Sequence, residues 1–206
     1  YDQAEAAFKQ AIALNDSILE SYTGLAGLYL QTKRIDEAIR EYETALSKNP
    51  KLVQAHMMIG MIYESRKQYD QAQARYQEAL KINPRFAPAA NNLAWLMIER
   101  GGNLDVALGY AQTAREVMPT DPNVADTLGW IYYQKKVYLK AVSLLKEAAE
   151  QLHENPVVLY HYGMALYKNE NKSEARKALE KSLQLNSNHP GAAEAKTTLA
   201  ELSSPP

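Results

Sequence analysis

The chain has 206 residues, of which 46% are hydrophobic and 23% charged, and its formal net charge at pH 7 is −1. An ordinary apolar fraction with balanced charge argues against a disordered chain, and no segment is basic enough to offer nucleic acid a phosphate-binding stripe. The sequence contains no cysteine, which excludes disulfides, thiolate nucleophiles and cysteine-ligated metals. No apolar run reaches the roughly 18 residues of a membrane span, and we recognise no signal peptide.

Residues 1–18 predict one amphipathic helix, because Ala4, Ala7, Phe8 and Ala11 recur at helical spacing. The same spacing of small and large residues recurs in the second half of each of the repeated units that follow in the chain. We therefore interpret this helix as the second helix of a truncated repeat. The chain thus starts in mid-repeat, and we expect it to be part of a longer protein. We also expect the outer side of this helix to be half uncovered and to pair with a second copy.

Residues 19–52 and 53–86 are two complete units of 34 residues, each predicted to form a helix, a tight turn, a second helix and a stop. In the second unit, VQAHMMIGMIYESRKQYDQAQARYQEALKINPRF, small residues stand at positions 8, 20 and 27 and large ones at positions 7, 11 and 24. The small residues let paired helices approach closely, and the large ones fill the space between pairs. Pro84 near the end of the unit stops the second helix, because proline lacks the amide hydrogen.

Residues 87–121 form the next unit, in which Gly101-Gly102-Asn103 lengthens the inter-helix turn by one residue. Two further units occupy residues 122–155 and 156–189. Residues 190–206 predict a capping helix, from about Ala192 to Leu202, and a tail. We expect the capping helix to face the last repeat through Ala195, Leu199 and Leu202, and to point Glu194, Lys196, Thr198 and Glu201 outward.

Five tandem units of 34 or 35 residues with these landmarks resemble the tetratricopeptide repeat (TPR) family. The resemblance implies an all-α, right-handed superhelical solenoid of helix-turn-helix repeats, in which the first helices line a concave surface. It also implies a non-catalytic scaffold that binds a protein or peptide partner. Parts of the chain are similar to bacterial TPR proteins, including those of cell-envelope and exopolysaccharide systems. The compartment stays open between cytoplasm and bacterial periplasm or cell envelope.

Positions 2, 5, 9 and 12 of the first helices form a stripe outside the packed positions 4, 7, 8 and 11, and this stripe, together with position 6, defines the predicted binding face. Aromatic and methionine side chains are frequent there from the second unit onward, and exposed clusters of this kind usually mark recognition surfaces. We therefore predict an exposed aromatic and methionine-rich groove that binds a peptide segment. An alternative is that these side chains pack on the next repeat or under the carboxy-terminal helix. The predicted partner-binding residues are Met57, Met61, Asn91, Asn92, Trp95, Asp126, Trp130, Tyr133, Tyr160, His161, Met164 and Tyr167.

Two other functions stay open, a carbohydrate-associated role and self-assembly into a structural solenoid. In the first, aromatic rings would stack on sugars, with Asn91, Asn92 and Asp126 binding hydroxyl groups. The rings in question are those of Trp95, Trp130, Tyr133, Tyr160 and Tyr167. In the second, the groove or the uncovered amino-terminal helix would receive a second copy.

We find no sequence pattern that indicates enzymatic activity, and we predict no catalytic, cofactor-binding or metal-binding residue. The four histidines form no HExxH motif or i,i+4 pair. His161 could approach Asp126, but no nucleophile or phosphate-binding loop accompanies them, so we interpret His161 as a polar contact. Charged residues of the second helices, such as Asp36, Glu37 and Arg40, are expected to form a solvated face with i,i+4 pairs.

Overall fold

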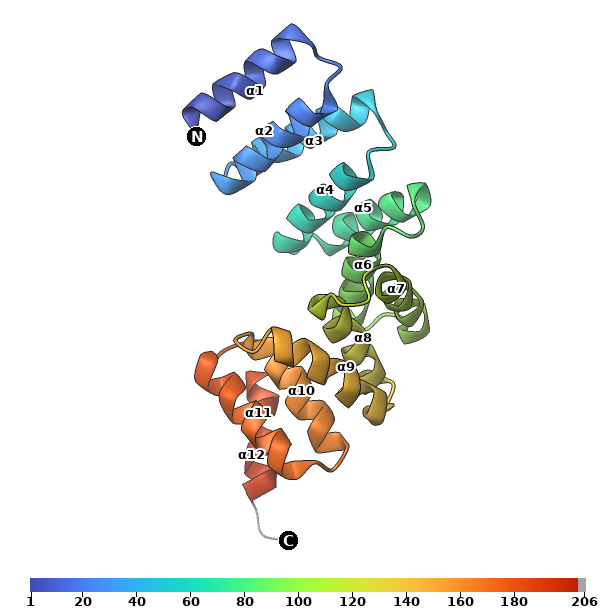
Figure 1. Ribbon diagram of the computed structural model, residues 1–206, viewed down its shortest axis with the longest axis vertical. Coiled ribbons are helices and arrows are strands. Elements are labelled where there is room, and N and C mark those ends of the chain that lie inside the picture. Colours follow the sequence, from blue (N-terminus) through green and yellow to red (C-terminus); the bar gives the residue numbers. More distant parts are fainter. Residues whose placement is uncertain (204–206) are drawn as a thin grey trace. The chain divides into compact units, whose positions relative to one another are not determined.

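The structure, a computed structural model, describes residues 1–203, which form twelve α-helices joined by short turns (Figure 1). The predicted all-α fold of helix-turn-helix repeats is therefore confirmed. Contacts divide the chain into two compact units, Tyr1–Leu96 and a second unit that begins at Met97. Residues 204–206 of the predicted tail lie outside the described residues. Among the helices described, none combines the length and apolar character that a membrane span requires.

Unit 1 contains six helices that pack mainly against their neighbours in sequence. Its core combines buried side chains from the first and second helices of successive repeats, among them Leu25, Tyr29, Tyr42 and Ile59. The last three residues of the sixth helix belong to unit 2. The helices are α1 (Asp2–Leu14), α2 (Leu19–Gln31), α3 (Ile35–Lys48), α4 (Val53–Ser65), α5 (Tyr69–Ile82) and α6 (Ala87–Glu99).

Unit 2 repeats this arrangement, with the first helix of each pair followed by its partner. In addition, α10 contacts both α8 and α12, so first helices of successive repeats lie side by side. The carboxy-terminal helix thus takes the place of a further first helix. The helices are α7 (Leu104–Val117), α8 (Pro122–Gln134), α9 (Tyr138–Gln151), α10 (Pro156–Lys168), α11 (Lys172–Leu185) and α12 (Ala192–Ser203).

Small residues at three positions of each repeat allow the paired helices to approach, as the sequence predicted. A Cβ atom added to Gly60 would lie 2.6 Å from the ring of Tyr76, which is fully buried. The position-20 residue of all five second helices from α3 onward is an alanine with no exposed surface. These alanines are Ala38, Ala72, Ala107, Ala141 and Ala175.

The turn within each repeat contains a residue in the left-handed conformation, which closes the first helix. In the third repeat this residue is Gly101, and the turn has one residue more than the turns of the other repeats. The extra length brings Asn103 to the start of α7, where its side chain accepts hydrogen bonds from the backbone N–H groups of Asp105 and Val106. The other four turns place Lys33, Lys67, Lys136 and Glu170 in the same conformation.

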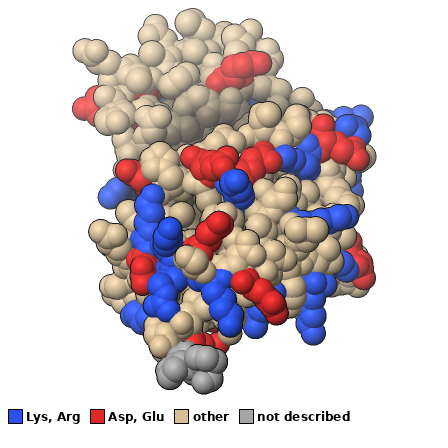
Figure 2. Space-filling view, turned by 60° about the horizontal axis from the view of Figure 1, so that its bottom comes forward, with Lys and Arg blue, Asp and Glu red and all other residues tan. Residues whose placement is uncertain are grey.

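Ion pairs between successive repeats cross the outer face of the second helices. The expectation of pairs within one helix is wrong for Asp36, which binds Arg66 of the next repeat at 2.7 Å. The reason is that 34-residue stacking brings residues about 30 apart together. Similar contacts join Asp16 to Lys48, Glu43 to Arg75, Asp105 to Lys135, and Arg115 to Glu147. Figure 2 shows that basic and acidic side chains are interspersed on the face it presents.

Helix α12 lies close to the predicted bounds and packs on the last repeat through Ala195 and Leu202, as predicted. Its buried side chains are Ala192, Ala195 and Thr198, whereas Leu202 is only half-buried. The prediction that Thr198 points outward is wrong, because its hydroxyl donates to Met164 Sδ of α10 at 3.6 Å. Thr198 thus lies on the buried side of the helix, and Leu202 still packs against Leu166, Ala175 and Ala178.

Candidate functional site

The first helices of unit 2 carry the aromatic residues that the sequence placed on the binding face. Trp130 of α8 stacks on Tyr133 with ring centres 4.4 Å apart, and on His161 of α10 with ring centres 4.1 Å apart. Tyr160 packs at an angle against Trp130, His161 and His189. These side chains form one aromatic cluster, because repeats stacked at a 34-residue period bring positions 5, 6 and 9 into contact.

His161 and Asp126 approach each other inside this cluster, as the sequence suggested. The Nδ1 atom of His161 lies 2.9 Å and 3.1 Å from the two carboxylate oxygens of Asp126. Both contacts hold the imidazole ring of His161 facing the carboxylate of Asp126. The two residues are 3% and 8% exposed, and the pair links α10 to α8. Since no serine, cysteine or phosphate-binding glycine loop accompanies the pair in the sequence, we assign it a packing role.

Helix α12 covers part of the same face by three contacts at 34-residue spacing. The hydroxyl of Tyr160 donates to Glu194 at 2.5 Å, and the hydroxyl of Tyr167 donates to Glu201 at 2.6 Å. Thr198 contacts Met164 between them. Burial and the hydrogen bond to Glu194 raise the pKa of Tyr160. The carboxy-terminal helix therefore closes this side of the last repeat.

The predicted exposure of the binding face is wrong for half of its residues. Trp130 is only 8% exposed, because Tyr133, Tyr160 and His161 surround its ring. The sugar-stacking hypothesis consequently draws no support from Trp130 or Tyr160. The role of these residues in binding a partner stays a prediction. The buried members are Met57, Asp126, Trp130, Tyr160, His161 and Met164.

The first helices of unit 1 present a more open face. Met61 of α4 is 45% exposed, and a Cβ atom added to Gly27, at the same position of the preceding repeat, would meet no atom within 4 Å. Asn92 bonds to the hydroxyl of Tyr76, and this hydroxyl donates to Glu64 at 2.6 Å. Burial, followed by the hydrogen bond to Glu64, raises the pKa of Tyr76. The predicted site residues Asn91 and Trp95 are half-buried.

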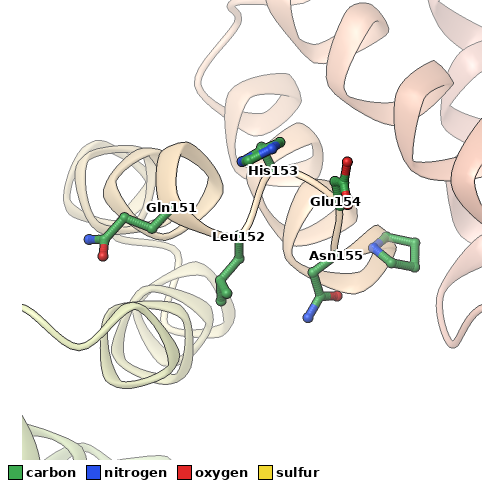
Figure 3. Close-up of a pocket in the computed structure, with 6 residues that line it drawn as sticks. Gln151, Leu152, His153, Glu154 and Asn155 are labelled. Atoms are coloured by element: carbon green, nitrogen blue, oxygen red, sulfur yellow. The ribbon is translucent and has the colours of Figure 1, made fainter.

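Two hollows of unit 2 were not predicted. One, of about 510 Å³, is formed by the segment between α9 and α10, from Gln151 to Pro156. In Figure 3, Leu152 and Asn155 point to one side of this segment and His153 lies on the other. Because one continuous segment lines this hollow, side chains from separate helices do not converge there.

The second hollow is a cleft of about 360 Å³ between α9 and α11, over α10. Leu159 and Tyr162 come from α10, and Ala149 and Ala178 come from the two outer helices. Charged and polar side chains complete the lining. A comparison of successive repeats along the sequence could have indicated this cleft. Only here are position 28 of one repeat, Ala149, and position 23 of the next repeat, Ala178, both alanine. The other lining residues are Lys146, Glu150, His153, Glu174, Lys177 and Lys181.

The described residues contain no candidate metal-binding site. Within residues 1–203, three or more histidine, aspartate or glutamate side chains do not gather in an arrangement that could hold a metal ion.

Comparison with known proteins identifies the class of this all-helical repeat protein. The family model described as "Tetratricopeptide repeat" matches residues 1–62 and 65–131, which is more than half of the chain. A second family model, "Anaphase-promoting complex, cyclosome, subunit 3", matches residues 101–182. The chain therefore belongs to the tetratricopeptide repeat family, whose members are generally non-catalytic scaffolds for protein interaction. No curated protein sequence matches the chain.

Solved structures of TPR proteins share the fold. YrrB, described as a TPR protein with an unusual peptide-binding site, is 22% identical with a TM-score of 0.70; the match covers 93% of this chain and 98% of YrrB. PilF of Pseudomonas aeruginosa is also 22% identical, with a TM-score of 0.68 and coverage of 91% and 89%. A chain of the APC/C hetero-tetramer Cut9–Hcn1 is 18% identical with a TM-score of 0.75; the match covers 98% of this chain and 39% of that one. At these identities the similarity concerns the fold alone.

Proposed function

We propose that the protein is a non-catalytic scaffold that binds a peptide segment of a partner protein on the first-helix face of unit 1. The observation that carries the proposal is the exposure of Met61 in the middle of α4, together with the open space around Gly27 at the same position of the preceding repeat. A methionine side chain adapts to differently shaped apolar groups, and an open backbone position leaves space for a peptide. Trp95, at the same position of the following repeat, extends this apolar character.

Other parts of the first-helix face are less suited to such a role. In unit 2 the rings at these positions are in contact with one another, and α12 covers the face beside α10. YrrB has a peptide-binding site on a similar fold, which is consistent with the proposal. Its low identity carries no residue-level argument, so the test must address Met61 directly.

The proposal is tested with peptides selected from a random displayed library against the 206-residue chain. The dissociation constant of a recovered peptide is then measured by fluorescence anisotropy for wild type, Met61→Glu and Leu139→Glu. Leu139 is 75% exposed on α9, a second helix, and serves as the matched control. We expect Met61→Glu to weaken binding about tenfold or more, which corresponds to about 1.4 kcal/mol. Equal affinities for all three proteins, or failure to recover any peptide, would contradict the proposal.

A further inference from the structure

The cleft between α9 and α11 differs from the equivalent places between other second helices. Between α7 and α9, Arg115 at position 28 pairs with Glu147 of the next repeat through two hydrogen bonds of 2.9 Å and 2.6 Å. Between α3 and α5, Arg75 at position 23 pairs with Glu43. Each pair joins one second helix to the next.

Both arginines are replaced by alanine around the cleft, and both glutamates by lysine. Ala149 stands at the repeat position of Arg115, and Ala178 stands at the position of Arg75. The positions of Glu43 and Glu147 are occupied by Lys146 and Lys181. No ion pair can therefore bridge α9 and α11 at these positions, and the surface of α10 is uncovered over a volume of about 360 Å³.

The lining combines an apolar floor with an excess of positive charge. Its apolar part consists of Ala149, Leu159, Ala178 and the ring of Tyr162. Lysine side chains of the rim outnumber the two carboxylates, those of Glu150 and Glu174. Lys146 lies 3.9 Å from Glu150, on the same helix. Among the interactions of the described residues, Lys177 and Lys181 make no side-chain hydrogen bond or ion pair.

We infer that this cleft is a second interaction site, which takes a large apolar side chain of an acidic peptide segment from a partner protein. The apolar side chain occupies the space that leucine or arginine side chains fill between other repeats. Carboxylates of the peptide bind Lys177 and Lys181 and thus provide the negative charge that Glu43 and Glu147 provide elsewhere. A volume of this size accommodates one aromatic or branched aliphatic side chain with part of its backbone.

The inference is tested by fluorescence anisotropy with a labelled peptide that carries one phenylalanine between two pairs of glutamates. The same peptide with alanine in place of phenylalanine is the control for charge alone. We expect saturable binding of the phenylalanine peptide, at least tenfold weaker binding of the alanine peptide, and weaker binding of both as salt is raised. Equal affinity for the two peptides, or no binding at millimolar concentration, would overturn the inference.

Variants of the chain separate the two parts of the site. Ala149→Leu combined with Ala178→Leu fills the cleft with leucine, which other repeats carry at the same two positions as Leu46 and Leu144. The variant should therefore fold, and it should bind the peptide at least tenfold more weakly. Lys177→Glu combined with Lys181→Glu should abolish binding, whereas Lys172→Glu, a charge reversal on the same helix outside the cleft lining, should not. Unchanged binding by the filled variant would overturn the inference.

Two further controls identify the source of the ligand and the face involved. A simple amphipathic acid, 3-phenylpropionate, should compete at least tenfold less effectively than the peptide, and equal competition would overturn the assignment to a peptide. Met61→Glu should leave binding of the acidic peptide unchanged, because Met61 belongs to α4 of unit 1 and the cleft to unit 2. An effect of Met61→Glu equal to that of the filled variant would contradict a separate site.

Discussion

Individual glycines of this chain differ in what they contribute to helix packing. Gly60 and Gly27 both lie inside first helices, where glycine has a lower intrinsic helix propensity than alanine. The position of a Cβ atom on Gly60 is occupied by the Tyr76 ring, whereas that on Gly27 is open. The contact with Tyr76 therefore requires glycine at residue 60, and packing makes no such demand at residue 27.

The two glycines give opposite predictions for replacement by alanine. Gly60→Ala should lower the free energy of unfolding by about 1–3 kcal/mol, because the fully buried Tyr76 ring has to move. Gly27→Ala should raise it by about 0.5–1 kcal/mol, because alanine restricts the unfolded chain and favours the helix. Urea unfolding followed by far-UV circular dichroism measures both. A stabilising Gly60→Ala substitution would show that the ring has space to shift.

At the scale of the element, α12 ends the repeat array with polar contacts in place of a full apolar interface. Its glutamates accept hydrogen bonds from Tyr160 and Tyr167, each 34 residues earlier, and its buried side chains are Ala192, Ala195 and Thr198. A terminal helix with small and charged residues keeps its outer side polar, which repeat proteins require of a cap. The same carboxylates impose their negative charge on nearby tyrosines.

This environment predicts a loss of stability at alkaline pH. Burial, followed by the charge of Glu194, raises the pKa of Tyr133 to about 12, above its ordinary value of 10.0. As the pH rises from about 10 to about 12, the unfolded chain loses this proton and the folded chain keeps it, so unfolding becomes more favourable. One such group lowers the free energy of unfolding by at most about 1.4 kcal/mol per pH unit.

Urea unfolding at a series of pH values from 8 to 11.5 measures this effect. Tyr133→Phe should reduce the slope of unfolding free energy against pH above pH 10. Tyr1→Phe removes a phenol that is 74% exposed and should leave the slope unchanged. The same slope for wild type and Tyr133→Phe would show that the proton of Tyr133 is not retained on folding.

At the scale of the whole molecule, α1 packs against α2 on one side, and among the described residues nothing covers its other side. In α1 no residue is fully buried, and Ala4, at position 20, is exposed although its five counterparts are completely buried. Leu14 at the end of α1 is 80% exposed. This face presents apolar side chains to solvent in the 206-residue chain, and apolar faces of this kind promote association.

We predict that the chain self-associates through α1 as its concentration rises. Multi-angle light scattering should show a mass that increases with concentration for wild type. Ala4→Glu combined with Leu14→Glu should raise the dimer dissociation constant about tenfold or more, because charge would be buried on pairing. Leu139→Glu, at a position on α9 that is 75% exposed, should have no such effect. A constant monomer mass for wild type would refute the prediction.

The repeat pattern of the sequence determined the helices and their pairing. Helical hydrogen bonds are local, and a 34-residue period with small residues at fixed positions specifies which helices approach each other. Ala72, Ala79 and Gly60, for example, could be assigned to close contacts between paired helices from their repeat positions alone. The extra residue in the turn before α7 was equally visible, because Gly101 provides the left-handed conformation that four other repeats impose on lysine or glutamate.

Tertiary structure alone decided which side chains of the first helices are accessible. Trp130 and Met61 share position 9, yet one is buried beneath residues 30 or 31 further along the chain and the other is exposed. The burial of Thr198 in α12 likewise reflects its contact with Met164 of α10, which the pattern of α12 itself does not indicate. Exposure is a property of the neighbours of a residue, and a repeat position specifies the direction of a side chain without specifying what lies against it.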